Sequence, residues 1–406
     1  MEFDILILGS DANAYYMARC VHEAYNKKAY LIGKDRLAFT KYSDILQIQY
    51  EKNLWNEKIF VEIINNFAEE RKERKVLVIS TNETYAEYIM RNQEVLKTNL
   101  LYAYPSIEVL KTLTNKEIFY KTYKRSELDF PETYYFDCKK NTLLPNTIEY
   151  PIVLKPANVV SYNHLSFEGK NKIYKIENEK ELKSVIKRIK EAGYVDKLII
   201  QEFIEGDDSN LFDAVVYVDR NGKVKVLSFA QIGLQEQTKT MVGNAAVLIN
   251  GFNTTNGDTT KMMKKITKFM ESIHYHGFAE VDMKYDKKTN TFKVLEINAR
   301  QGRCSYYITA LGANLVKTLV EDVIYQNELP EKILKEQILL TFVPKGIIKK
   351  YIKNKEFKQK ALYLWKKKKK VSPMIYNKDK NWKRFLMLRK RLFHYYKEYK
   401  NSYWRS

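Results

Sequence analysis

VLEINARQGR (residues 294–303) places an acid, an amide and two arginines directly after an apolar run. Glu296 and Asn298 are two residues apart, so on a β-strand their side chains share one face. The segment GFAEVDMKYD (277–286) also has the pattern of a strand, and a short turn, KKTN, separates the two. If the strands pair antiparallel, Asp282 lies beside Glu296. Two carboxylates and an amide oxygen are hard ligands that Mg²⁺ prefers, so these residues predict a magnesium site.

The two arginines suggest what such an ion would meet. Magnesium held by few protein groups normally keeps positions for nucleotide phosphates, and Arg300 could bind these bidentately. Arg303 could bind a substrate carboxylate or pair with a neighbouring acid. The alternative is a sheet face without metal, on which both arginines neutralise Asp282 and Glu296.

Two lysines and a hinge favour the nucleotide interpretation. Lys155 ends an apolar strand just before Pro156, which cannot continue a β-ladder. Lys116 starts a helix, where a cation opposes the helix dipole and has no local reason to be favoured. KLIIQEFIEGDD (197–208) is an apolar strand that leads into an acidic turn. Its backbone could bind an adenine edge, and an acid after it could bind ribose. Either lysine alone could be an ordinary surface residue.

In this order, the motifs resemble those of the ATP-grasp superfamily over roughly residues 1–325. The resemblance implies use of ATP and Mg²⁺, with Mn²⁺ also possible. Lys116 and Lys155 would contact the nucleotide phosphates. The remaining implied contacts are adenine at Glu202 and Ile204, ribose at Glu205 or Asp208, and the metal at Asp282, Glu296 and Asn298.

Within the superfamily, the whole chain is similar to bacterial D-aspartate ligases, through LGSDANAYYMAR, LKPAN, FEGKNK, IEGDDSN, GFAEVDMKYD and EINARQGR. Those enzymes join the β-carboxylate of D-aspartate to the lysine ε-amine of a peptidoglycan precursor. The resemblance implies an amide-forming ligase that passes through an acyl phosphate, with Arg300 and Arg303 as catalytic candidates. A different acid, amine or cell-surface polysaccharide acceptor is the alternative.

One segment departs from the superfamily pattern. The phosphate-covering loop after Lys155, residues 158–172, holds a single glycine where relatives often have several. His164 in this loop could act as a base toward the amine, although a surface histidine is the commoner role.

The expected fold is α/β. Residues 1–109 alternate strands and helices in a βαβαβ order that predicts a Rossmann-like domain. The first turn, GSDANAYY (9–16), has one glycine where a dinucleotide fingerprint needs three, so we expect no NAD site. By resemblance this is a pre-ATP-grasp domain, followed by two α+β ATP-grasp lobes (110–200 and 201–330). A basic helical extension (331–406) completes the chain.

Charge is concentrated in that extension. The net charge is +21, and residues 345–406 hold 22 Lys and Arg against three acids, so the rest carries only about +2. Three scattered cysteines without metal spacing suit a reducing compartment. No secretory leader and no apolar run of the roughly 18 residues needed for a membrane span is present, which favours the cytoplasm.

The extension has two interpretations. WKRFLMLRKRLFHYY (382–396) places Trp382, Phe385, Leu388, Leu392 and Tyr396 on one helical face among basic residues. This face could contact an anionic membrane surface, or it could dock on the body, which we favour. We expect an amino acid and an anionic peptidoglycan precursor as partners. The near-neutral body argues against a nucleic-acid partner and against a non-enzymatic polyanion-binding protein. Oligomeric state is not predicted.

Overall fold

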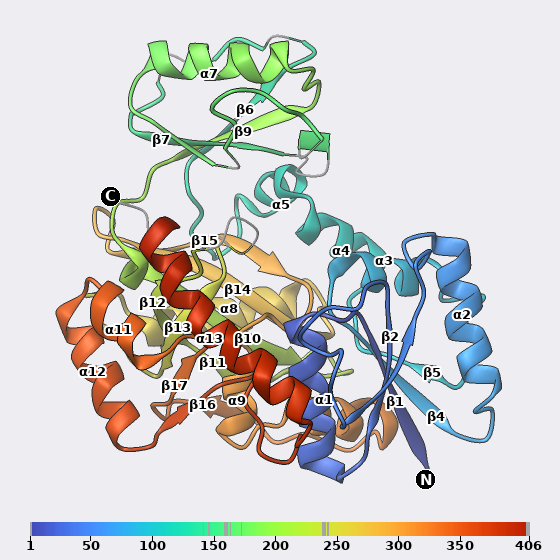
Figure 1. Cartoon of the computed structure of the whole chain (residues 1–406). Helices are drawn as coiled ribbons and strands as arrows, with labels where there is room; N and C mark the ends of the chain where they lie inside the picture. The colour runs from blue at the N-terminus through green and yellow to red at the C-terminus, as the bar shows by residue number, and fades with distance from the viewer. Residues whose placement is uncertain are drawn as a thin grey trace.

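The computed structural model describes residues 2–140, 142–144, 147–157, 161–162, 164–171, 173–237, 241 and 243–402. The N-terminal part is a five-stranded parallel sheet in the order β3-β2-β1-β4-β5, drawn in blue in Figure 1. This confirms the Rossmann-like prediction, although β3 was not expected. Its elements are β1 (Phe3–Leu8), α1 (Ala12–Tyr25), β2 (Ala29–Gly33), β3 (Leu46–Tyr50), α2 (Glu57–Glu69), β4 (Lys75–Ser80), α3 (Glu83–Arg91) and β5 (Leu100–Leu101).

The glycine after β1 has a packing role. Gly9 has a φ of +123°, and a Cβ built on it would overlap the side chain of Thr81 at the end of β4. Two residues on, the side chain of Asp11 caps α1 by accepting a hydrogen bond from the Ala14 N–H at 3.0 Å. The close approach of the ends of β1 and β4 is therefore enough to explain why a glycine is needed here, and a bound dinucleotide is not required as an explanation.

A small lobe stands apart at the top of Figure 1. Its four-stranded antiparallel sheet has the order β6-β9-β7-β8, and α7 covers one face. Leu154, Ile186 and Leu198 belong to its own apolar core. The elements are β6 (Thr133–Asp137), β7 (Ile152–Pro156), β8 (Tyr174–Ile176), α7 (Glu179–Glu191) and β9 (Lys197–Glu202). Two helices, α4 (Ile107–Thr114) and α5 (Lys116–Tyr123), lead into the lobe.

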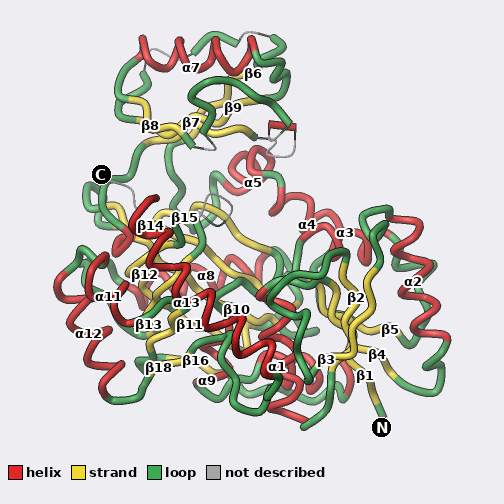
Figure 2. The backbone as a smooth tube through the Cα atoms, in the orientation of Figure 1, coloured by secondary structure: helices red, strands yellow, loops and turns green. Residues whose placement is uncertain are grey.

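Among the described residues, the largest sheet has nine strands and forms the body of the molecule. Its strands, like those of the other sheets, are yellow in Figure 2. Its main path is β15-β14-β10-β12-β13-β17-β18, and β11 pairs with β10 and β16. The strands are β10 (Leu211–Val218), β11 (Val224–Ser228), β12 (Ala230–Gln235), β13 (Ala245–Asn250), β14 (Gly277–Asp286), β15 (Thr291–Asn298), β16 (Lys332–Leu334), β17 (Leu339–Thr341) and β18 (Lys370–Val371).

Two sequence predictions were wrong in detail. The alternating segment VKVLSFAQIG (224–233) predicts one strand, but the strand breaks at Phe229, and the two pieces, β11 and β12, pair with β10 at different places. The segment SYYITALGANLVKTLVEDVIY (305–325) predicts a single helix, but this helix is broken at Gly312, whose φ is +91°. It forms α9 (Tyr306–Ala310), α10 (Leu315–Leu319) and a π-helical turn (Val320–Ile324), and α8 (Thr259–Ser272) precedes β14.

The basic extension packs on the body, as expected for docking. Its helices are α11 (Lys345–Tyr351), α12 (Lys355–Lys366) and α13 (Trp382–Ser402), and α13 crosses the front of Figure 1. The predicted contact face was wrong for Trp382, Phe385 and Tyr396, which are exposed. Arg384, Tyr395 and Tyr399 are buried instead.

A buried cation explains this rotation of α13. The guanidinium of Arg384 lies 3.4 Å from the centre of the Tyr15 ring and 3.1 Å from Asp379. It also donates to the carbonyl oxygens of Phe39 and Met374. A stacked, paired arginine is stable in an interior, so hydrophobicity alone pointed to the wrong face.

The division into domains stays a prediction. β9 runs to Glu202, two residues past the expected boundary at 200, and β16 to β18 from the extension join the sheet of the body. Among the described residues, no helix combines the length and the apolar character needed to cross a bilayer.

The contact between α12 and β12 yields a test of how the extension is held. A Cβ on Gly233 would overlap the ring of Phe357, which is fully buried. We expect Gly233→Ala to lower the free energy of unfolding by about 1–3 kcal/mol because the ring must move. Denaturant unfolding measures this loss. Combined with Phe357→Leu, the loss should be smaller than the sum of the two single losses, and strict additivity would contradict the contact.

Candidate active site

The β14–β15 hairpin brings three predicted residues together. Asp282 is directly opposite Glu296, and Glu280 is opposite Asn298, which confirms the antiparallel pairing. The amide of Asn298 donates to Asp282 at 3.1 Å. The register shifts after Asp282, so β15 carries one extra residue at this point. The predicted acids and amide therefore share one small area of the sheet.

Two further acids lie in the same area and were missed by the sequence analysis. Asp213 of β10 is paired in register with Asp282, and Glu280 precedes Asp282 by two residues on the same strand face. Tyr307 donates to Asp213 at 2.9 Å. The i, i+2 spacing of Glu280 and Asp282 was a usable signal. Asp213 had none, because its strand partner is 69 residues away.

Burial and repulsion between like charges raise the pKa values of three acids in this area. Burial, followed by repulsion from Asp282, raises the pKa of Asp213 to about 7. Burial and the charge of Asp213 raise the pKa of Glu280 well above its ordinary value. Burial and the charges of Glu280 and Glu296 do the same to Asp282. A cluster in this condition favours binding of a cation.

Protein cations already approach the cluster from two directions. The ammonium of Lys116, at the start of α5, contacts the carboxylate of Glu296. Arg300 follows β15, and its Nε lies 2.9 Å from Glu83 at the start of α3. Although burial opposes its charge, Glu83 and Glu280 raise the pKa of Arg300 overall. Helix α3 of the N-terminal part thus reaches the site through the ion pair of Glu83 with Arg300.

The predicted nucleotide residues lie along the small lobe. Lys155 is on β7, with its ammonium 5.9 Å from the centre of the Tyr120 ring of α5. Glu202 ends β9 and accepts from the Glu132 N–H at 3.1 Å, while its carboxylate also contacts Lys293 of β15. Ile204 is buried just beyond it. Residues 202–204 therefore form a connection between the small lobe and the body.

The two ribose candidates differ in their surroundings. Asp208 accepts two hydrogen bonds of 2.8 Å from Gln235, one from the backbone and one from the side-chain amide. Glu205 is exposed. Asp208 thus binds Gln235 of β12, whereas the carboxylate of Glu205 is accessible to a ligand.

Arg303 is placed away from the acid cluster. It pairs with buried Glu236 at 2.5 Å and lies 3.9 Å from the centre of the Phe342 ring. Tyr395 of α13 donates to the same carboxylate at 3.0 Å. Of the two alternatives for Arg303, the structure contains the pairing with a neighbouring acid. A role for it in substrate binding stays a prediction.

The residues present fit a magnesium ion. Asp282, Glu296 and Asn298 offer two carboxylates and one amide, all with oxygen donors. Among the described residues, no group of three or more His, Cys, Asp or Glu side chains has the arrangement needed to hold a metal ion by itself. A partial oxygen set matches an ion that takes its other ligands from phosphates and water. The lid-like loop 158–172 lies partly outside the described residues, and His164 within it is exposed.

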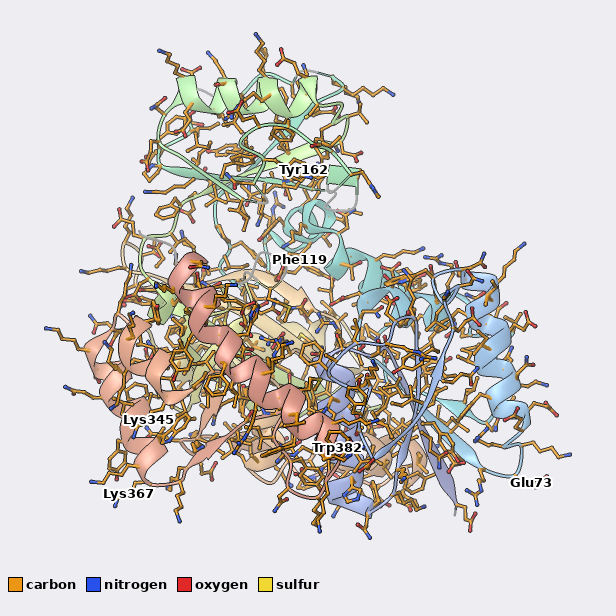
Figure 3. All side chains as sticks on the ribbon, in the orientation of Figure 1. Glu73, Phe119, Tyr162, Lys345, Lys367 and Trp382 are labelled. Atoms are coloured by element: carbon orange, nitrogen blue, oxygen red, sulfur yellow. The ribbon has the colours of Figure 1, made fainter. Side chains whose placement is uncertain are left out.

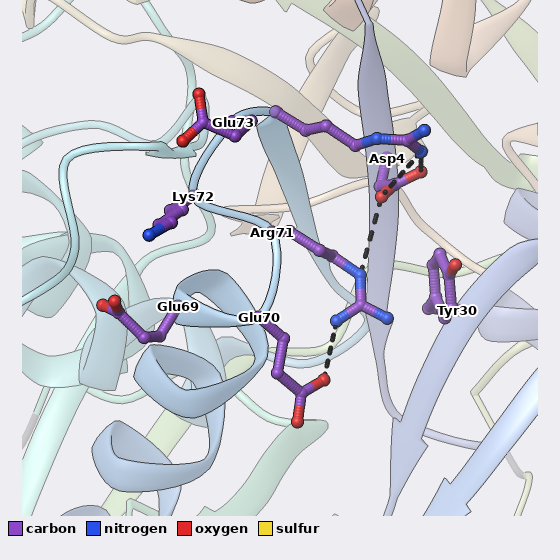
Figure 4. A pocket seen from close by; sticks show the side chains of 8 residues that line it. Asp4, Tyr30, Glu69, Glu70, Arg71, Lys72 and Glu73 are labelled. Atoms are coloured by element: carbon purple, nitrogen blue, oxygen red, sulfur yellow. Dashed lines mark hydrogen bonds and ion pairs between the residues drawn. The ribbon is translucent and has the colours of Figure 1, made fainter.

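A separate hollow of about 390 Å³ lies beside β1 and the end of α2 (Figure 4). Arg71 lies 3.5 Å from Asp4 and 3.1 Å from Glu70 there. Its lining includes none of the residues predicted for nucleotide or metal. Paired arginines and acids explain it as a surface ion-pair network.

Comparison with known proteins decides the family. The chain is 33% identical to the D-aspartate ligase of Enterococcus faecium over 410 aligned residues, covering 97% of this chain and 95% of that one. The chain belongs to the D-aspartate ligase family. No protein-family model matches it.

The fold of this D-aspartate ligase family member is similar to the folds of several solved structures. An L-amino acid ligase from Bacillus licheniformis covers 80% of this chain and 74% of its own, with a TM-score of 0.57 and 16% identity. An ADP complex of N5-carboxyaminoimidazole synthetase from Staphylococcus aureus covers 84% and 82%, with a TM-score of 0.59 and 15% identity.

A third structure, the biotin carboxylase domain of a Hydrogenobacter thermophilus carboxylase with MgADP, covers 82% of this chain and 72% of its own (TM-score 0.58, 16% identity). The ATP-grasp fold predicted from the motifs is confirmed. The chain is an ATP-dependent carboxylate–amine ligase, and use of ATP and Mg²⁺ is typical of its family.

The raised pKa of Asp213 predicts a pH dependence of stability. The folded chain keeps this proton up to about pH 7, whereas an unfolded aspartate releases it near 3.8. Between these values the folded state binds more protons, so this group removes stability as pH rises. In EDTA, the melting temperature of wild type minus that of Asp213→Asn should fall between pH 4.5 and 7.5. A constant or rising difference would contradict the assignment.

Proposed function

We propose that this chain joins the β-carboxylate of D-aspartate to the ε-amine of a lysine in a peptidoglycan precursor, at the expense of ATP. The observation that carries the proposal is the end-to-end match with the Enterococcus faecium D-aspartate ligase, which includes the basic extension. We place this reaction in the cytoplasm, where ATP and the soluble precursors of the wall are available.

The reaction needs activation of the acid. A carboxylate oxygen attacks the γ-phosphorus of ATP, the bond to the bridging β–γ oxygen breaks, and ADP leaves an acyl phosphate behind. The amine nitrogen then attacks the acyl carbon, the carbon–oxygen bond to phosphate breaks, and inorganic phosphate takes the electron pair. The nitrogen loses a proton to form the amide. Such a transfer depends on positioning and charge stabilisation more than on covalent help from the protein.

Residues of the acid cluster and the cations around it divide this work. Lys116 and Lys155 bind the phosphates, and Lys116 exchanges Glu296 for a phosphate oxygen, since both partners are anions. Arg300 holds the transferring phosphoryl group or the incoming carboxylate. A magnesium ion at Asp282, Glu296 and Asn298 would supply neutralisation of phosphate charge when bound.

Adenine is bound at the hinge by the backbone around Ile204, while Glu202, through Lys293, keeps the hinge attached to β15. Ribose is bound by Glu205, because Gln235 already occupies the carboxylate of Asp208. Substrate selectivity then depends on the groups around Arg300, including Glu83 and Glu280.

Replacing one metal candidate tests the site. Glu296→Gln keeps the size of the side chain but removes its charge, so we expect ADP release to fall by roughly 100-fold or more, as for loss of a key charge-stabilising group. Glu94→Gln, at an exposed position of the N-terminal part, serves as the matched control and should retain full activity. Steady-state ADP release at saturating Mg²⁺ measures both. An unimpaired Glu296→Gln enzyme would remove the hairpin from the active site.

A substrate screen tests the reaction. ADP release should require an acid and an amine together, with D-aspartate preferred over L-aspartate and D-glutamate, and with a lysine-containing muropeptide as acceptor. Mass spectrometry should find one added aspartyl residue. Equal turnover with another amino acid, or with an amine unrelated to peptidoglycan, would replace the substrate while leaving the ligase chemistry in place.

A further inference from the structure

The outward face of α13 carries large apolar side chains. Five of them are between 46% and 74% exposed, so about half or more of each side chain is in contact with water. They are Trp382, Phe385, Leu386, Phe393 and Tyr396. A surface helix normally turns polar residues to water and apolar ones to the core, so a row of this kind indicates a contact surface.

These side chains cannot turn inward, because the opposite face of α13 is held by specific contacts. Arg384 lies between Tyr15 and Asp379, and Tyr395 donates to Glu236. Tyr399 donates to the backbone oxygen of Gln235 at 2.6 Å. The exposed row is therefore a fixed feature of the folded protein.

Basic residues alternate with the apolar ones on this face. The exposed cations of the helix are Lys383, Arg389, Lys390, Lys397 and Lys400. Lys383 lies 5.6 Å from the centre of the Trp382 ring, and Arg389 lies 4.6 Å from that of Phe385. The one acid of α13, Glu398, is engaged by His394 at 2.9 Å. The face is thus apolar and cationic at once.

The neighbouring helices add to this charge. The Tyr351 ring of α11 lies 5.3 Å from that of Tyr399, so α11 and α13 are adjacent. Lys349 and Lys350 lie in the last turn of α11, and a run of five lysines (366–370) begins at the last residue of α12. In Figure 3 the three helices occupy one side of the molecule, with Lys345, Lys367 and Trp382 labelled on it.

We propose that the outer face of α13 docks on an anionic phospholipid surface, with the helix lying in the plane of the membrane. Apolar side chains that alternate with cations match a bilayer interface, where chains enter the acyl boundary and cations meet lipid phosphates. A second copy of this chain is disfavoured, since two faces of the same strong positive charge repel. Leu386 has no ring on which a base could stack, so its exposure fits lipid better than single-stranded nucleic acid. The proposal does not rest on the identity of the ligase substrates.

Vesicle binding by the full chain tests the proposal. Wild type should sediment at physiological salt with vesicles of phosphatidylcholine containing one third phosphatidylglycerol, at least ten times more strongly than with pure phosphatidylcholine. The fluorescence of Trp382 should shift to the blue on binding, and Trp382→Phe should lose that shift. Absence of binding to anionic vesicles would overturn the proposal.

Matched variants distinguish binding through the outer face of α13 from non-specific binding through other exposed apolar or basic residues. Combined replacement of Phe385, Leu386 and Phe393 by Ser should weaken vesicle binding at least ten-fold, whereas Ser at the equally exposed Val95, Leu143 and Ile333 should change it less than two-fold. Gln at Lys383, Lys390 and Lys397 should abolish the preference for anionic lipid, and Gln at Lys180, Lys183 and Lys187 of α7 should not.

The same variants distinguish other occupants. ADP release with soluble substrates and the melting temperature should be unchanged in all of them, which shows that folding and the active site are intact. Equal loss of vesicle binding in the controls would contradict a role for α13. Binding of single-stranded DNA that the Ser variant alone loses, without vesicle binding, would assign the face to nucleic acid. Self-association lost in that variant, again without vesicle binding, would assign it to a second copy.

Discussion

Four carboxylates on three adjacent strands set the central constraint of this structure, because like charges so close together cannot all ionise without cations. Asp213, Glu280, Asp282 and Glu296 come from β10, β14 and β15, and the first three have raised pKa values. The positive charges of Lys116 and Arg300, which lie beside these carboxylates, offset part of the repulsion between them. A site that must attract cations is also one that can hold magnesium and phosphates.

This requirement joins the parts of the chain. Lys116 belongs to α5 before the small lobe, and Lys293 connects β15 to the end of β9 through Glu202. Arg300 connects the end of the hairpin to Glu83 at the start of α3. Each link is an ion pair between elements far apart in sequence, and each ends at or beside the hairpin. Movement of one part would therefore change the charge balance in the others.

The extension follows a different physical logic. Its helix α13 is held by buried Arg384, which stacks on Tyr15. Tyr399 donates a hydrogen bond to Gln235 at the end of β12, and Tyr395 donates one to Glu236, the next residue. Because Arg384, Tyr395 and Tyr399 occupy the inner face of α13, several large apolar residues of the helix lie on its outer face. The hydrophobic pattern correctly predicted a helix that docks on the body. It placed Trp382, Phe385 and Tyr396 on the docking face of that helix, whereas these residues are exposed.

The sequence by itself determined the parallel N-terminal sheet, the β14–β15 hairpin and the pairing of Asp282 with Glu296, because strand periodicity and a short turn are local properties. Only the tertiary structure decided that Asp213 joins these acids, that Arg303 pairs with Glu236, and that Arg384 is buried. The first two pairs are 69 and 67 residues apart in the chain, and the Tyr15 ring on which Arg384 stacks precedes it by 369 residues, so all three contacts form only through packing. Local patterns specify the type and extent of an element, whereas the pairing of buried charges, and with it the face that a helix such as α13 buries, depends on which distant element packs against it.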